Sequence, residues 1–125
     1  MKYNIIIAGS RNFTDYEMVK KSLKKFLTSK ETSDKPNIIC GMARGADMLG
    51  YRLAKEFNLP LKEFPADWNT YGKRAGYIRN EQMAKYAHDN GNGILFAFWD
   101  GKSRGTKLMI ELAKKYNLET YIFYF

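Results

Sequence analysis

Short apolar runs alternate along the chain with longer segments in which apolar residues recur every three or four positions. The first run is continuous and rich in β-branched residues, as expected of a strand buried on both faces. The runs predict strands at Tyr3 to Ala8, Asn37 to Cys40, Leu61 to Phe64, Ile94 to Trp99 and Glu119 to Phe125. The spaced segments predict amphipathic helices between these strands.

Capping and helix-breaking residues set the ends of the predicted helices. Thr14 or Asp15 can cap the first helix, and Pro60 prevents the second from continuing past it. A long helix is expected from about Tyr77 to His88, because the glycine-rich segment 89–93 breaks helices. Strands that alternate with helices form a parallel sheet with right-handed crossovers. The pattern therefore predicts a single Rossmann-like three-layer α/β/α domain over residues 1–125, with a mainly parallel five-stranded sheet.

The loop after the second predicted strand combines glycine, arginine and the start of a helix. It runs from Gly41 through Arg44 and Gly45 to Asp47. The glycines permit backbone angles closed to other residues, and the first amides of the helix have no internal partner. Arg44 adds a guanidinium group suited to phosphate or carboxylate. These features favour an anion-binding loop; the alternative is a strand-to-helix turn that uses glycine only for its geometry.

Two further glycine-bearing loops follow other predicted strands, at residues 9–13 and 100–106. In parallel sheets, ligands bind beyond the carboxyl ends of the strands, where the strand order reverses. The three loops should converge there with the segment at Asp67 and Trp68, and their glycines, arginines, hydroxyls and helix N-termini describe a phosphate site. Trp68 and Trp99 could stack on a nucleobase, or serve as core or lid residues. The predicted ligand-binding residues are Gly9, Ser10, Arg11, Gly41, Ala43, Arg44, Gly45, Asp47, Asp67, Trp68, Arg79, Asn80, Asp100, Gly101, Ser103, Arg104, Gly105 and Thr106.

The composition is that of a packed and basic protein. Hydrophobic residues make up 45% of the chain and aromatic residues 15%, which argues against disorder. The net charge of +8 implies attraction to an anionic partner, such as a nucleotide, a nucleic acid or an acidic protein. Lysines on the predicted solvated helix faces could instead serve solubility alone.

Cysteine and histidine are too scarce for disulfide or metal chemistry. Cys40 and His88 are the single residues of their types, so no internal disulfide and no metal-ligand cluster is expected. Cys40 ends an apolar run and is predicted to be a small buried side chain. We expect no metal and no cofactor. Residues 1–8 are too short for a signal-peptide core and no run is long enough to span a membrane, which predicts a cytoplasmic protein without a membrane partner.

Five motifs in order give the chain a resemblance to a known family. They are Gly9-Ser10-Arg11-Asn12-Phe13, the Gly41 to Asp47 loop, Phe64-Pro65-Ala66-Asp67-Trp68, Ile78-Arg79-Asn80 with Met83 and Ala84, and residues 98–106. Over nearly the whole chain, these motifs resemble the YspA/YpsA-related SLOG family. The SLOG superfamily includes the cytokinin-activating LOG phosphoribohydrolases and the Rossmann domain of the DNA-processing protein DprA. The resemblance implies a ligand that is a phosphorylated nucleotide, a nucleotide derivative or a nucleic acid, and a role as sensor, carrier or nucleotide-processing protein.

The chain differs from the LOG enzymes at the position of a glutamate in their sequence motif. Arg79 and Met83 match their R-K-x-x-M segment, and Gly105-Thr106 match part of their P-G-G-x-G-T-x-x-E segment. Met109, however, stands at the glutamate position. Glycosidic-bond hydrolysis needs a carboxylate near the bond, so an N-glycosidase or phosphoribohydrolase-like activity is the alternative and the catalytic residues stay unknown. The carboxylates that could replace the glutamate are Glu81, Asp47, Asp67 and Asp100.

The sequence also has features that suit two macromolecular partners, a single-stranded nucleic acid and a second copy of the chain. The DprA-like loop, the basic charge and the aromatic residues would suit single-stranded nucleic acid, but most of the aromatics fall in predicted core strands, so this is the second alternative. The final run, Tyr121 to Phe125, is expected at an edge of the sheet, and an uncovered apolar edge strand invites pairing. We therefore expect a homodimer; the alternative is a basic monomer whose helices cover both faces of this strand.

Overall fold

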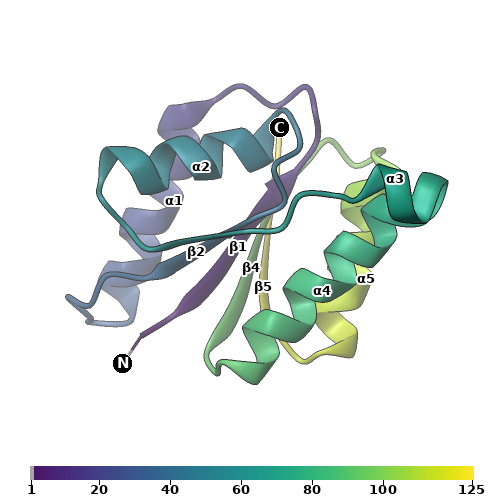
Figure 1. Ribbon diagram of the computed structural model, residues 1–125. Helices are drawn as coiled ribbons and strands as arrows, with labels where there is room; N and C mark the ends of the chain where they lie inside the picture. Colours follow the sequence, from purple (N-terminus) through teal and green to yellow (C-terminus); the bar gives the residue numbers. More distant parts are fainter. Residues whose placement is uncertain (1) are drawn as a thin grey trace.

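Five strands form one sheet in the computed structural model, which describes residues 2–125 (Figure 1). The strands are β1 (Asn4–Gly9), β2 (Asn37–Cys40), β3 (Leu61–Glu63), β4 (Gly93–Trp99) and β5 (Glu119–Tyr124). All neighbours pair in parallel, in the order β3-β2-β1-β4-β5. The chain moves outward from β1 to β3 and then returns to the other side of β1. The strand order therefore reverses between β1 and β4, which is where parallel sheets bind ligands.

Helices cover both faces of this sheet and give the domain three layers (Figure 1). The helices α1 (Tyr16–Ser29) and α2 (Ala46–Glu56) lie on one face, and α4 (Ala75–Asp89) and α5 (Arg104–Lys115) on the other. A short helix, α3 (Trp68–Tyr71), and a 3-10 turn, η1 (Gly72–Arg74), connect β3 to α4. No helix within residues 2–125 is both long and apolar enough to cross a membrane. The predicted Rossmann-like α/β/α fold is confirmed, with a sheet that is parallel throughout.

Alternating side chains of β1 build a separate core on each face of the sheet. Ile5 and Ile7 belong to the core under α1 and α2, whereas Ile6 and Ala8 belong to the core under α4 and α5. The three isoleucines have no exposed surface. A strand alternates its side chains with a period of two, so a continuous apolar run is what a strand covered on both faces requires.

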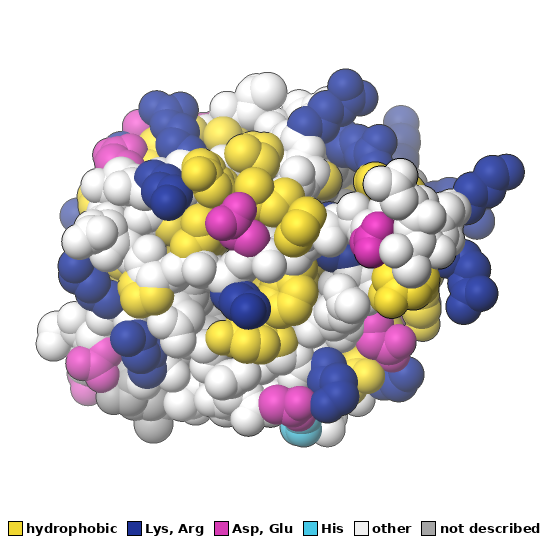
Figure 2. All heavy atoms as spheres, viewed as in Figure 1, with side chains coloured by type: hydrophobic (Ala, Val, Ile, Leu, Met, Phe, Trp, Pro, Cys, Tyr) yellow, Lys and Arg dark blue, Asp and Glu magenta, His cyan; other side chains and the backbone are white. Residues whose placement is uncertain are grey.

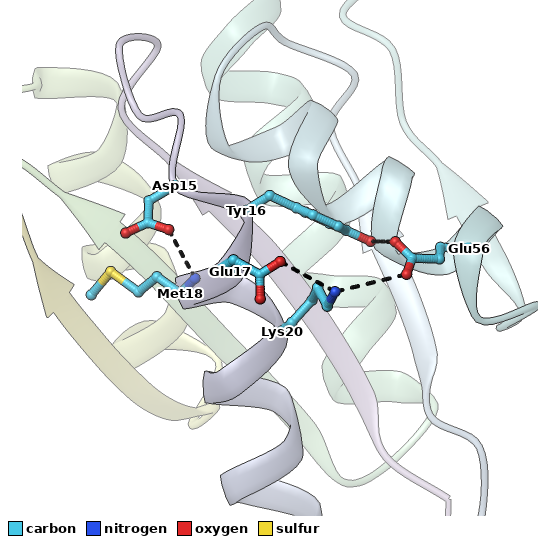
Figure 3. Close-up of polar contacts among 6 residues, drawn as sticks. All are labelled: Asp15, Tyr16, Glu17, Met18, Lys20 and Glu56. Atoms are coloured by element: carbon cyan, nitrogen blue, oxygen red, sulfur yellow. Dashed lines mark hydrogen bonds and ion pairs between the residues drawn. The ribbon is translucent and has the colours of Figure 1, made fainter.

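Polar contacts join the start of α1 to the end of α2 (Figure 3). The Asp15 carboxylate accepts a hydrogen bond from the Met18 amide at 3.1 Å, so Asp15, rather than the other candidate Thr14, caps α1. The Tyr16 hydroxyl donates to Glu56 Oε1 at 2.6 Å, and Lys20 Nζ lies 3.8 Å from the other oxygen of that carboxylate. Burial and the bond to Glu56 raise the pKa of Tyr16 to about 12, so the phenol stays protonated at neutral pH.

The structure differs from the predicted elements mainly between β3 and α4. Residues 68–74 form α3 and η1, where the sequence pattern predicts no helix, and α4 begins at Ala75 rather than Tyr77. Because α3 buries none of its residues, it has no apolar spacing to mark it. Its start depends instead on the Asp67 carboxylate, which accepts from the Thr70 amide at 3.1 Å. Each predicted strand end lies within one residue of the observed one.

The strand β5 lies at an edge of the sheet, as predicted. Tyr121 and Phe123 pack toward the core under α1, and Ile122 packs toward the opposite core. Tyr124 and Phe125 remain 62% and 49% exposed. Self-association through this apolar edge stays a prediction.

Candidate functional site

Ser10 holds the three glycine-bearing loops together at the carboxyl ends of β1, β2 and β4. Its amide donates to the carbonyl oxygen of Phe98 at 2.9 Å, and its own carbonyl accepts from the Ala46 amide at 3.3 Å. Its hydroxyl accepts from the Asp100 amide at 3.2 Å. Ser10 is only 1% exposed. One buried serine therefore bonds to the other two loops, and this is why segments distant in sequence form one crevice.

Two glycines allow the loops to pack this closely. A Cβ atom at Gly9 would lie 2.2 Å from the carbonyl oxygen of Phe98, and one at Gly45 would lie 2.5 Å from that of Ser10. Gly45 also has a φ of 83°, which strongly favours glycine. The space beside Gly45 is therefore occupied by the backbone of the neighbouring loop. The sequence alone suggested that a ligand would approach the chain closely at this position.

A carboxylate and a guanidinium group are buried together beside Gly41. Asp47 is 5% exposed and Arg79 is 9% exposed. A Cβ atom at Gly41 would lie 2.7 Å from Asp47 Oδ2 and 2.8 Å from Arg79 Nη1. Arg79 donates through Nη1 to the carbonyl oxygen of Gly41 and through Nε to Asn80 Oδ1 at 2.9 Å. The Ala43 amide donates to Asp47 Oδ2 at 3.3 Å, so both groups are held in place by the loop around them.

Burial raises the pKa of Asp47 to about 6. The charge of Arg79 and hydrogen bonds from the amides of Ala43 and Gly9 oppose this rise and favour the ionised form. Desolvation is therefore the larger effect. Among the carboxylates proposed as substitutes for the LOG glutamate, Asp47 is the one that is buried in the crevice and has a raised pKa.

Two adjoining hollows make up the crevice. The smaller, which we call the Arg79 pocket, has a volume of about 70 Å³. It is lined by Ala8, Gly9, Ala43, Asp47, Arg79, Asn80, Ser103, Gly105, Thr106 and Met109. The larger, which we call the Arg44 depression, is an open hollow of about 470 Å³ lined by Ser10, Arg11, Asn12, Arg44, Asp100 and Ser103. Because Ser103 lines both, the two hollows are neighbours.

The first turn of α5 faces the Arg79 pocket without a side-chain cap. Ser103 occupies the N-cap position of α5 and makes no capping hydrogen bond; its hydroxyl lies 3.3 Å from that of Thr106. Gly105 and Thr106 follow and line the pocket. Uncapped amides at a helix N-terminus favour oxygen ligands and negative charge. This end of the pocket can therefore accept an anionic or hydroxyl-bearing group.

Several predicted residues lie outside the two hollows. Gly41 packs against Asp47 and Arg79, and Gly45 packs against the backbone of the first glycine-bearing loop. Asp67 caps α3. Gly101, on the β4–α5 connection, and Arg104, the first residue of α5, are exposed. Trp68 is 53% exposed on α3, which excludes a core role for it.

Other candidate residues have structural partners. The indole nitrogen of Trp99 donates to the Ser103 carbonyl at 3.0 Å, so this ring supports the β4–α5 loop. The Glu81 carboxylate accepts from Lys115 at 3.0 Å and from Tyr116 at 3.2 Å. Glu81 is therefore engaged between α4 and α5, away from the residues that line the crevice.

The sequence prediction missed three lining residues. Ala8, Asn12 and Met109 line the hollows but were not among the predicted ligand-binding residues. Met109 lies three residues after Thr106 on α5, so both share one helix face; that spacing was the available signal. The position at which LOG enzymes carry glutamate therefore does face the pocket, and an apolar side chain fills it.

Two further observations bear on the chemistry available. Burial raises the pKa of Cys40 to about 12, so the thiol is an inert, buried side chain. Within the described part of the chain, no group of three histidine, cysteine, aspartate or glutamate residues is arranged to hold a metal ion. A hollow of about 540 Å³ lies elsewhere, between α1 and the end of α2. It holds none of the predicted residues, so we place the candidate site in the crevice, where buried polar groups and arginines meet.

The fold and the crevice define a Rossmann-like α/β/α domain with arginines and a buried carboxylate at the point where strand order reverses. The chain belongs to the YspA, cpYpsA-related SLOG family, whose model matches residues 3–71. It is also 32% identical over 119 residues to the Gene 61 protein of Mycobacterium phage D29, a match that covers 89% of this chain and 88% of that protein. No solved structure matches the chain. Membership of the SLOG family suggests a nucleotide-related function.

Proposed function

We propose that the crevice binds a phosphorylated nucleotide or nucleotide derivative, with the protein acting as a sensor, carrier or nucleotide-processing protein. The observation that carries this proposal is the meeting of arginines from three separate segments. Arg11 and Arg44 line the Arg44 depression, and the buried Arg79 lines the adjoining pocket. Guanidinium groups are suited to phosphate. The net charge of +8 further favours an anionic ligand.

The charges of the two hollows differ, and this difference favours a different part of the ligand in each. In the Arg44 depression two arginines outnumber one carboxylate, Asp100, so it suits a phosphate. In the Arg79 pocket, the charge of Arg79 is balanced by that of Asp47 when the carboxylate is ionised. A polar but uncharged group, such as the hydroxyls of a ribose, suits this balance because the carboxylate can accept from a hydroxyl.

Replacing Arg44 with alanine is expected to weaken binding of ribose 5-phosphate or a nucleoside monophosphate by about ten- to hundredfold, as removal of a charge-assisted bond implies. Arg44 is exposed, so folding should barely change. Isothermal titration calorimetry measures the affinity. Lys25→Ala removes the same charge from the exposed face of α1 and is the matched control. Equal affinities for Arg44→Ala and the wild-type protein would contradict the proposed phosphate position.

We further infer that the crevice does not hydrolyse the glycosidic bond in the manner of a LOG enzyme. Met109 is 1% exposed and lines the pocket where the LOG-like carboxylate would be. Free base should therefore be released slowly or not at all from nucleoside monophosphates, as measured by chromatography. Rapid release would contradict this inference; if Asp47→Asn abolished it, Asp47 would be the replacing acid.

A further inference from the structure

Three large aromatic side chains are exposed where β3 leads into α4. Trp68 is 53% exposed, Tyr71 43% and Tyr77 44%. The short helix α3 buries none of its residues, so these rings are not needed for its packing. Exposed aromatic side chains combine an apolar ring with a polar group and are common where proteins bind ligands, so this segment is a candidate binding surface.

The Trp68 ring lies along the same face of α4 as the Arg79 pocket. A Cβ atom at Gly76 would lie 3.8 Å from Trp68 Cη2, so the indole rests over Gly76. Arg79 and Asn80 are three and four residues further along α4 and therefore share that face with Gly76. Both line the Arg79 pocket. The positions that carry these two pocket side chains therefore lie about one helical turn along α4 from the position under the indole.

The Arg44 depression, the Arg79 pocket and the Trp68 indole follow one another in the order of the phosphate, ribose and base of a nucleotide. The Arg44 depression suits the phosphate, and it adjoins the Arg79 pocket at Ser103. The pocket, of about 70 Å³, suits the hydroxyls of the ribose, and the Trp68 indole comes next along α4. We propose that the base of a free nucleotide stacks on Trp68 while its phosphate occupies the Arg44 depression. This inference rests on the proposed function and adds to it the position and chemistry of the base.

The charge around α3 suits the same ligand. Residues 67–80 contain one carboxylate, Asp67, which caps α3, against three cations, Lys73, Arg74 and Arg79. Figure 2 shows lysine and arginine side chains, and one acidic side chain, around the segment that Figure 1 labels α3. An aromatic face beside cationic side chains favours a ligand with both a π-system and a phosphate. Base–aromatic stacking tolerates any base, so Trp68 contributes affinity without selecting one base.

The test compares the four nucleoside 5′-monophosphates with ribose 5-phosphate, which lacks the base. Calorimetry is expected to show that the wild-type protein binds the best nucleotide about 5- to 150-fold more tightly than ribose 5-phosphate, which is the range of one stacking contact. Trp68→Leu should remove this preference and leave the affinity for ribose 5-phosphate unchanged. Trp68→Phe should retain part of the preference. Phe57→Leu is the matched control, since Phe57 is 47% exposed at the far end of α2.

Each outcome separates this inference from the proposed function. If the wild-type protein binds ribose 5-phosphate as tightly as every nucleotide, Trp68 is not a base platform, although the phosphate site stands. Retention of the preference by Trp68→Leu overturns the inference in the same way. If neither ligand type binds, the proposed function fails and the inference fails with it. A 5′-phosphorylated oligonucleotide that binds through Trp68 when no mononucleotide does would overturn the assignment to a free nucleotide.

Discussion

Replacing Arg79 with methionine is expected to lower the free energy of unfolding by about 1.5–3 kcal/mol near pH 8, the usual cost of losing a hydrogen bond that involves a charged group. The buried Asp47 also loses, at that pH, the cation that favours its ionised form. Arg79 is the largest electrostatic influence that favours the ionised form of the buried Asp47. Its guanidinium group also donates to the carbonyl oxygen of Gly41 and to Asn80. Methionine fills similar space but donates no hydrogen bond, so the variant should also lose the ribose part of ligand binding.

Urea unfolding at several pH values measures this effect. The loss should shrink toward about pH 4, because Asp47 then takes up a proton and no longer needs a cation. The double variant Arg79→Met, Asp47→Asn is the control: it should recover much of the stability near pH 8 without recovering ligand binding. A loss that is independent of pH and remains in the double variant would show that Arg79 acts through packing and hydrogen bonds alone.

Replacing Asp47 with asparagine is expected to stabilise the free protein by about 3 kcal/mol near pH 8 and to change little near pH 4. The pKa of Asp47 is about 6 in the folded protein against an ordinary value of 3.8. The folded state therefore holds the proton more tightly than the unfolded state between these values. The stability from this proton is fully present below the unfolded pKa and is lost as the pH rises through about 6. Asparagine has no such proton to lose.

The measurement is the difference in unfolding free energy between variant and wild type, because the effect of the overall positive charge cancels in that difference. Asp89→Asn is the matched control. The pKa of Asp89 is lowered by its hydrogen bond to Lys85 on the surface of α4, so the variant should not gain stability near pH 8. If Asp47→Asn is less stable than the wild type at both pH values, the hydrogen bonds of the carboxylate outweigh its desolvation. If Asp47→Asn is instead more stable, as expected, the carboxylate reduces the stability of the free protein, as groups at functional sites often do.

A residue's role could be predicted when its contacts come from nearby positions in the sequence, and could not when they come from distant ones. Asp15 could be identified as a cap because its partner, the Met18 amide, is three residues away. The apolar spacing of α4 predicts that Ile78, Met83 and Ala87 point inward, and the structure buries Met83 and Ala87 but leaves Ile78 only half-buried. It does not predict that Arg79 and Asn80 are buried too. Arg79 bonds to Gly41 on the β2–α2 loop and Asn80 bonds to Gly105 on α5, and neither contact is visible in local spacing.

The tertiary structure also gives different roles to residues for which the sequence predicted the same role. Trp68 and Trp99 were both candidates for stacking, core or lid roles. Trp99 supports the Ser103 carbonyl, whereas Trp68 is exposed over α4. Likewise, Asp47 and Glu81 were both candidate acids, but Asp47 is buried in the crevice and Glu81 is paired with Lys115 on the surface. Partners from other elements decided each case.

The sequence by itself determined the order and type of the main elements, the parallel sheet and the edge position of β5. These depend on hydrophobic periodicity and on short-range breakers, which are local properties of the chain. Only the tertiary structure decided which polar residues are buried, which carboxylate has a raised pKa and where the aromatic rings lie relative to the crevice. Burial, desolvation and ring position depend on atoms brought together from loops tens of residues apart, and no local pattern encodes their distances.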